Sequence, residues 1–273
     1  MPPASCLDNK KVVKKLLVTK LIQVQLNLNN FDKSIIVPFS TIDWHGKVAM
    51  VIFLRGCNMR CLYCQNYKLW EDDVHINVDD LLFEIQKNKD FIDAVIFSGG
   101  EPTINLELLT TVATEVKKIG LLVGVETNGT LPDNIFSLIN ATLLDGLFID
   151  VKAPLSSPQK YSAVAGVKTS QELLEKIRKS IKFGYLALKS GKLSELEIRT
   201  SVFKGIPKDR DILEIAQEFE HISYVLQQGR SEYSKNANLK TISRKELITI
   251  AKSCHRVMRI RTKEYGEELI SSS

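Results

Sequence analysis

The chain has 273 residues, of which 44% are hydrophobic and 25% are charged. This balance is typical of globular proteins and excludes a largely disordered or collagen-like chain, and no apolar run approaches the ~18 residues of a membrane-spanning helix. The formal net charge of +5 comes mostly from five lysines within residues 1–20, so the nearly neutral remainder does not favour nucleic acid as a partner.

Residues 1–34 give an ambiguous pattern. Apolar positions 13, 16, 17, 21 and 24 share a helical face, whereas positions 22, 24, 26 and 28 alternate as in a strand. We expect residues 1–34 to be an N-terminal extension of uncertain order and residues 35–273 to form one domain. The segment has no secretory pattern, and the five cysteines do not resemble a disulfide framework, so the expected location is the cytoplasm.

Six short apolar runs of strand length follow, at residues 48–54, 94–97, 121–125, 147–151, 196–202 and 222–226. Helical patterns occur at residues 106–116, 173–185, 212–219 and 247–254. Strands that alternate with helices predict a parallel sheet with right-handed crossovers. Both a barrel and a doubly wound sheet satisfy this pattern.

Polar residues and glycines gather at the C-terminal end of each predicted strand. The first strand leads into the cysteines, and the later ends carry Ser98–Pro102, Glu126–Gly129, Asp150 with Lys152, Arg199 with Thr200, and Gln227 with Gln228. In both kinds of parallel sheet this end is where ligands bind. We therefore expect the cysteines and these residues to converge on one rim.

The most specific motif is Cys57-Asn-Met-Arg-Cys61-Leu-Tyr-Cys64. Structural zinc sites usually present cysteines as two separate pairs, and here a second pair is missing. Three neighbouring thiolates without a fourth indicate a metal centre with an open position, such as a 4Fe–4S cluster in which one iron is free to bind substrate or cofactor.

Two other interpretations of the cysteine motif stay open at this point. His45 or His75 would complete a structural zinc site with three cysteines, and Cys6 or Cys254 would complete a four-thiolate electron-transfer cluster. Cys254 lies on the apolar face of its predicted helix and is interpreted as a packed core thiol.

The motif resembles the cluster loop of the radical S-adenosylmethionine (radical SAM) superfamily, in which an aromatic residue such as Tyr63 usually precedes the last cysteine. The run Ser98-Gly99-Gly100-Glu101-Pro102 resembles the glycine-rich motif of the same superfamily. The resemblance implies a partial (βα)6 TIM-like barrel that binds one 4Fe–4S cluster through Cys57, Cys61 and Cys64. It also implies that Gly99, Gly100 and Glu101 contact S-adenosylmethionine.

Further motifs resemble the activating enzymes of glycyl radical proteins, above all those of anaerobic ribonucleotide reductase. These are Ser40–Trp44, Phe53–Asn58, Thr127–Gly129, Asp150–Pro154, Arg199–Val202 and Gln227–Gln228. By that resemblance Glu126, Asn128, Asp150, Lys152 and Arg199 line the S-adenosylmethionine pocket. Two alternatives are that Arg199 pairs with a nearby acid such as Glu197 and that Glu126 is a solvated loop acid. The chain departs from the pattern at His45, Gln65 and Glu126, which leaves the substrate open more than the cofactors.

The resemblance implies reductive cleavage of S-adenosylmethionine and hydrogen abstraction from a glycine of a partner enzyme, with anaerobic ribonucleoside-triphosphate reductase as the favoured partner. It implies a flavodoxin- or ferredoxin-like electron donor and no membrane association. No side chain is predicted to act as a catalytic base. The alternatives are radical chemistry on a small molecule, as in deazaguanine biosynthesis, and a binding or electron-transfer protein with a structural metal.

Overall fold

The computed structural model describes residues 35–70, 77–236 and 238–271, so the predicted N-terminal extension, Cys6 and His75 lie outside the described residues. The described residues form a nine-stranded sheet with the strands in chain order. Strands β2 to β8 run parallel, and β1 and β9 form antiparallel edges. The strands are β1 Ile36–Ser40, β2 Ala49–Leu54, β3 Ala94–Gly99, β4 Leu122–Thr127, β5 Gly146–Asp150, β6 Glu195–Val202, β7 Ser223–Gln228, β8 Met258–Thr262 and β9 Gly266–Ile270.

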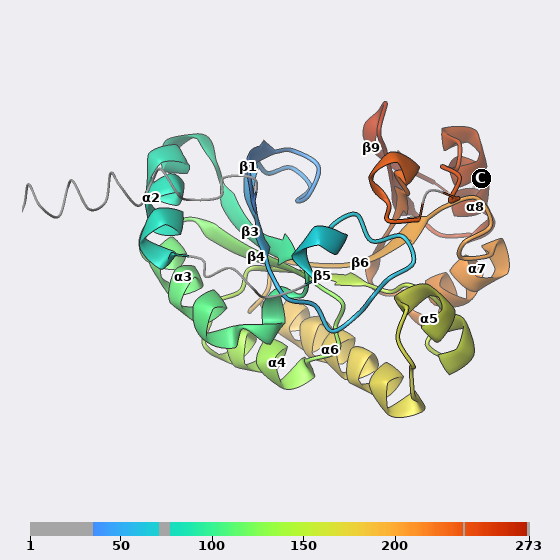
Figure 1. Cartoon of the computed structure of the whole chain (residues 1–273), viewed down its shortest axis with the longest axis horizontal. Helices are drawn as coiled ribbons and strands as arrows, with labels where there is room; N and C mark the ends of the chain where they lie inside the picture. The colour runs from blue at the N-terminus through green and yellow to red at the C-terminus, as the bar shows by residue number, and fades with distance from the viewer. Residues whose placement is uncertain (1–34, 71–76, 237, 272–273) are drawn as a thin grey trace, which may run out of the picture.

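Helices cover the outer face of the curved sheet, and α2, α3, α4 and α6 follow one another around it (Figure 1). Their apolar faces pack against the strands, and side chains such as Ser170, before α6, and Ser243, before α8, cap their first turns. No helix within the described residues is both long and apolar enough to cross a bilayer. The helices are α2 Val78–Asn88, α3 Leu106–Lys118, α4 Pro132–Asn140, α5 Pro158–Ala165, α6 Gln171–Lys189, α7 Asp209–Glu218 and α8 Arg244–Ser253.

The predicted α/β fold with a partial barrel of parallel strands is confirmed, with one correction to the number of strands. The six predicted strands are β2 to β7, but Met258–Thr262 adds a seventh parallel strand, β8. Its apolar pattern is interrupted by Arg259 and Arg261, which hid it in the sequence. No ladder joins β1 to β9 among the described residues, so the barrel is open on one side.

Trp44, from the loop between β1 and β2, fills the apolar end of the barrel interior. Its side chain is 2% exposed and meets Phe148 of β5 edge to face, with ring centroids 5.3 Å apart. Two glycines of the neighbouring strands make room for the indole: a Cβ atom would lie 3.0 Å from the Trp44 ring at Gly124 and 2.7 Å from it at Gly146. The barrel is therefore a packed core at this end, separate from the larger core between sheet and helices.

Removing the Trp44 indole should leave a cavity that these glycines cannot fill. We expect Trp44→Ala to lower the free energy of unfolding by about 3–5 kcal/mol, the usual cost for a large buried aromatic residue. The matched control is Phe91→Ala, because the side chain of Phe91 is 70% exposed, and we expect it to cost less than about 1 kcal/mol. Urea denaturation followed by circular dichroism checks both values, and equal losses would contradict the assignment of Trp44 to the core.

Candidate active site

A cavity of about 660 Å³ opens at the C-terminal ends of the parallel strands. It lies where sequence analysis placed the ligand rim, and it collects side chains from β1 to β9. With one exception, every predicted site residue lies on its wall. These residues are Cys57, Tyr63, Cys61, Cys64, Gly99, Gly100, Glu126, Asn128, Asp150, Lys152 and Arg199; the exception is Glu101.

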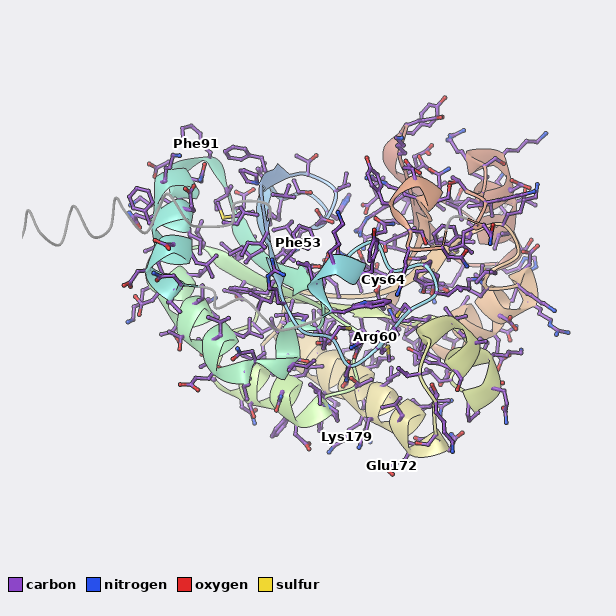
Figure 2. The ribbon with its side chains drawn as sticks, viewed as in Figure 1. Phe53, Arg60, Cys64, Phe91, Glu172 and Lys179 are labelled. Atoms are coloured by element: carbon purple, nitrogen blue, oxygen red, sulfur yellow. The ribbon has the colours of Figure 1, made fainter. Side chains whose placement is uncertain are left out.

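The cysteine loop follows β2 and is held in place by backbone contacts on both sides. On one side the amides of Arg60 and Leu62 donate to carbonyls at the end of α5, at 3.0 and 2.9 Å. On the other side the amides of Gly56 and Cys57 donate to carbonyls of the segment 69–70, at 2.8 and 3.2 Å. The loop crosses the front of the sheet, where Figure 2 labels Arg60 and Cys64.

Gly166, which ends α5, is the closest support of this loop. Its φ of +66° is in the left-handed region, and a Cβ atom there would lie 1.9 Å from the carbonyl oxygen of Arg60. Met59 and Tyr63 anchor the loop from within the core, and Tyr63 stacks on Phe203 with ring centroids 5.4 Å apart. The loop is therefore held in position by contacts with α5, with the segment 69–70 and with the core.

The three thiols of this loop are partly buried and neutral in the absence of a metal. Burial raises the pKa of Cys57 to about 11 and raises the pKa values of Cys61 and Cys64 as well, while the charge of Lys152 acts in the opposite direction on all three. Binding of iron would deprotonate these thiols, since thiolate is the ligand form. Lys152 therefore places one positive charge close enough to act on all three sulfur atoms.

The donor set fits a 4Fe–4S cluster better than a single ion. No three Cys, His, Asp or Glu residues of the described part of the chain converge closely enough to hold one metal ion, whereas a cluster takes each thiolate on a different iron. The indole of Trp70 lies beside Cys64 and counteracts the burial that raises the pKa of that thiol. The Trp70 Nε1 atom is buried and has no hydrogen-bond partner among the described residues, so this donor is free to serve a sulfur of a bound cluster.

The open zinc and four-thiolate interpretations find no support among the described residues. His45 pairs with Glu267 of β9 through Nδ1 and does not join the cysteines. Cys254 ends α8, donates its S–H to the carbonyl of Ile250 at 3.4 Å and is not part of the cavity wall.

The glycines after β3 allow two backbones to meet rather than leaving a gap. A Cβ atom would lie 2.3 Å from the carbonyl oxygen of Leu54 at Gly99, and 2.1 Å from that of Gly56 at Gly100. The amides of Gly100 and Glu101 donate to these same two carbonyls, at 2.8 and 2.7 Å. The end of β3 is therefore joined directly to the start of the cysteine loop.

The side chain of Glu101 lies in the protein interior and does not line the cavity. Its carboxylate is 1% exposed and accepts four hydrogen bonds: from the amide and hydroxyl of Thr103, the hydroxyl of Thr127 and the amide of Asn128. Asn128 in turn donates to the side chain of Asn58 at 2.8 Å. This chain of contacts connects the ends of β3 and β4 to the cysteine loop, and sequence analysis had assigned no role to Asn58 although it directly follows Cys57.

Lys152 and Asp150 form a pair at the end of β5, with Nζ and Oδ2 3.2 Å apart. Burial lowers the pKa of Lys152, but the carboxylate of Asp150 is the main group that raises it, to well above its usual value, so the ammonium group stays protonated. The Lys152 side chain is 7% exposed and that of Asp150 is 43% exposed. The pair therefore presents a fixed cation near the cysteines and an accessible carboxylate.

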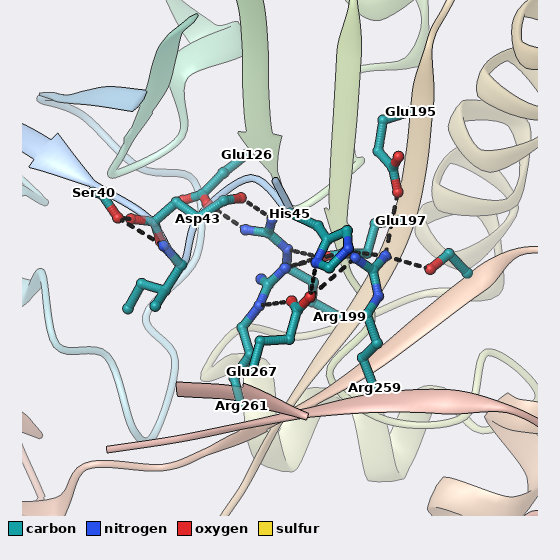
Figure 3. Close-up of polar contacts among 12 residues, drawn as sticks. Ser40, Asp43, His45, Glu126, Glu195, Glu197, Arg199, Arg259, Arg261 and Glu267 are labelled. Carbon is teal, nitrogen blue, oxygen red and sulfur yellow. Dashed lines mark hydrogen bonds and ion pairs between the residues drawn. The ribbon is translucent and has the colours of Figure 1, made fainter. Parts of the chain in front are cut away.

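Arg199 of β6 is held by two carboxylates inside the barrel. Its guanidinium pairs with Glu197 and Glu126 (Figure 3). It also lies over the ring of Phe148, 4.2 Å from the centroid. Burial raises the pKa of Glu126 and the charge of Arg199 lowers it, and its side chain is half-buried against Arg199, so Glu126 is a partner of this guanidinium and not a solvated loop acid. The sequence left open that Arg199 pairs with a nearby acid such as Glu197, and the structure shows this pair.

Comparisons with known proteins find a matching family and individual relatives. The family described as Radical SAM superfamily matches residues 51–189. A protein of Methanocaldococcus jannaschii that is named as a glycyl-radical enzyme activating enzyme is 34% identical over 225 residues, which is 80% of this chain and 90% of that protein. The pyruvate formate-lyase-activating enzyme of Staphylococcus aureus is 34% identical over 95 residues, 32% of this chain and 38% of that protein.

Solved structures show the same fold at low sequence identity. The structure of TYW1 with a lysine-pyruvate adduct bound has a TM-score of 0.57 at 18% identity, over 82% of this chain and 80% of that one. Archaeal TYW1 has a TM-score of 0.52 at 17% identity, over 88% of this chain and 82% of that one.

Gly166 provides a test of the support under the cysteine loop. We expect Gly166→Ala to displace the carbonyl of Arg60 and to remove most of the iron bound per chain after anaerobic reconstitution with iron and sulfide. Gly191→Ala is the matched control, because Gly191 has a similar φ of +73° but nothing within 4 Å of its added Cβ atom. Both variants bear the backbone strain, of order 1 kcal/mol, so equal iron contents would contradict a specific role for Gly166.

Proposed function

The chain belongs to the radical SAM superfamily, and from this premise we propose that it generates a glycyl radical in a partner enzyme. A member of this superfamily is an enzyme that uses a 4Fe–4S cluster and S-adenosylmethionine. When bound, the two supply one-electron cleavage of the sulfonium and a 5′-deoxyadenosyl radical that abstracts hydrogen from substrate.

In this proposal the cysteine loop holds the cluster, with Cys57, Cys61 and Cys64 each ligating one iron. Lys152 contributes the positive charge that offsets three thiolates in a partly buried site. The remaining wall residues, among them Tyr63, Gly99, Gly100, Asn128 and Asp150, surround S-adenosylmethionine. Glu101 supports them from behind, and Glu126 and Arg199 set the floor of the cavity through their ion pair.

The observation that carries the glycyl radical assignment is the archaeal relative, which matches over 90% of its own length. The shape of the site agrees with a protein substrate. The cavity is bordered by both edge strands, β1 and β9, and measures about 660 Å³. Its wall includes the exposed apolar residues Val37 and Phe39 of β1 and Ile42 of the loop that follows. A flexible glycine-containing segment of a partner can enter there.

The finer assignment within this proposal is anaerobic ribonucleoside-triphosphate reductase as the partner, with a flavodoxin- or ferredoxin-like protein as the electron donor. It rests on the motifs of residues 40–44, 150–154 and 199–202. The likeness to TYW1 concerns the fold alone and does not favour a small-molecule substrate.

Cleavage of S-adenosylmethionine is the first test. The chain is reconstituted with iron and sulfide without oxygen, reduced with dithionite and mixed with S-adenosylmethionine, and 5′-deoxyadenosine is quantified by chromatography. We expect product from the wild-type protein and from Cys254→Ala, and at least a ~100-fold loss in Cys61→Ala, because two thiolates cannot complete the cluster. Product that persists in Cys61→Ala, or is lost equally in Cys254→Ala, would refute the proposed ligand set.

Radical transfer to the partner is the second test. Purified anaerobic ribonucleoside-triphosphate reductase is added to the same mixture, and a glycyl radical is sought by electron paramagnetic resonance. We expect a signal that disappears when the target glycine is replaced by alanine. Formation of 5′-deoxyadenosine without any radical on this reductase would overturn the choice of partner and leave the cleavage reaction standing.

A further inference from the structure

The cavity wall at the ends of β7 and β8 is basic. Arg261 of β8 lies beside Gln227 of β7 in the ladder, and Lys263 follows on the same face two residues later. Arg230 lies two residues beyond β7 and close to Lys263. Glu232 raises the pKa of Lys263, and the positive charge of Arg230 lowers it. Three cations from two neighbouring strand ends therefore share one wall.

Two of these cations have donor capacity that the protein leaves unused. Arg261 is 7% exposed; its Nε donates to Glu267 at 2.7 Å and its Nη2 lies 3.0 Å from Glu197, but its Nη1 is buried without a partner. The guanidinium of Arg230 has no hydrogen bond or ion pair with any residue in the described ranges and lies on the cavity wall. Native proteins rarely leave a buried donor such as Nη1 of Arg261 unsatisfied.

The acids of the same cavity already have partners of their own. Glu126 pairs with Arg199, Asp150 pairs with Lys152, and Asp43 accepts the hydroxyl of Ser40. None of them contacts Arg230 or the free nitrogen of Arg261. The unused donors consequently call for an anion from outside the chain, and a carboxylate matches the planar edge of a guanidinium.

The opposite lip of the cavity is apolar. Val37, Phe39 and Ile42 line it with exposed fractions of 38%, 52% and 38%, and Phe39 meets the exposed ring of Phe91 edge to face, with centroids 6.5 Å apart. An extended peptide places alternate side chains on opposite sides. A peptide lying across this opening would present one side to the apolar lip and the other to the basic wall.

We propose that Arg230 and Arg261, with Lys263 at the rim, form an anion subsite that takes the carboxylate of an acidic side chain close to the target glycine in the substrate protein. The inference rests on the proposed function, which supplies the peptide nature of the substrate. It adds a sequence requirement to that substrate, namely an Asp or Glu near the glycine.

The subsite is tested by peptide binding to the cluster-loaded protein in the presence of S-adenosylmethionine. The probes are fluorescein-labelled nonapeptides of alanine with a central glycine and a single Asp at one of the three positions on either side, each paired with its Asn counterpart. We expect at least one Asp peptide to bind about tenfold more tightly than its Asn partner in fluorescence anisotropy, an effect that weakens as salt is raised. Equal affinities within every pair would overturn the proposal.

The variant that decides the assignment is Arg230→Gln, since Arg230 has no side-chain partner to lose and Arg261→Gln would also disturb buried ion pairs. We expect Arg230→Gln to reduce the Asp preference to less than about threefold. Arg210→Gln, an exposed arginine of α7 outside the cavity, should leave the preference unchanged. An Asp preference that survives Arg230→Gln would overturn the subsite.

Inorganic phosphate serves as the free-anion arm of the same experiment. We expect phosphate to displace the Asp peptide but not the Asn peptide, because phosphate and the Asp carboxylate compete for the same cations. Phosphate that binds the wild-type protein more tightly than every Asp peptide would point to a phosphorylated small molecule and overturn the peptide carboxylate. The glycyl radical measurement is independent of this test. If the protein generates the radical but shows no preference for an acidic peptide, the proposed subsite is wrong and the proposed function stands.

Discussion

One buried carboxylate connects the parts of this site. Glu101 has no contact with solvent, and the four hydrogen bonds that it accepts satisfy a charge that would otherwise be costly to bury. Those donors come from the turn after β3 and from the end of β4, and Asn128 continues the contact to Asn58 on the cysteine loop. Three segments that are distant in sequence are thereby held in one geometry. The positions of the thiols depend on this interaction as much as on the loop itself.

The interior of the barrel combines an apolar end with a charged end. Trp44 and Phe148 fill the first, and a network of carboxylates and guanidinium groups around Glu197 and Arg199 fills the second (Figure 3). Each buried charge is costly to remove from water, so the network is tolerated because nearly every group has an opposite charge within contact distance. The charged end lies directly under the cavity, where it fixes the positions of wall residues instead of maximising stability.

Much of the fold and the location of the site were predictable from the sequence. Strands β2 to β7 are short apolar runs, and their polar ends predicted the rim because parallel strands meet at one edge. Strand β8 was missed because its inward side chains are arginines, and an alternating pattern with charges inside does not differ from an exposed segment. Glu101 lies behind the cavity wall, which the motif could not show, because a motif shows which residue is required but not which way it points. Asn58 and Trp70 carry no pattern of their own, and only the folded chain shows them beside the cysteines.

The two edges of the barrel are joined by side chains alone. His45, on the loop after β1, meets Glu267 of β9, and the carbonyl of Asp43 accepts from Arg199, but no ladder of backbone hydrogen bonds connects β1 with β9 in the described ranges. Ladders are cooperative and resist local separation, whereas isolated side-chain contacts, one of them from a largely exposed histidine, open at lower cost. The barrel thus has a seam, and a polypeptide that presses into the cavity would widen the molecule there first. Widening at this seam would leave the parallel ladders from β2 to β8, whose ends carry the cysteine loop and Lys152, intact.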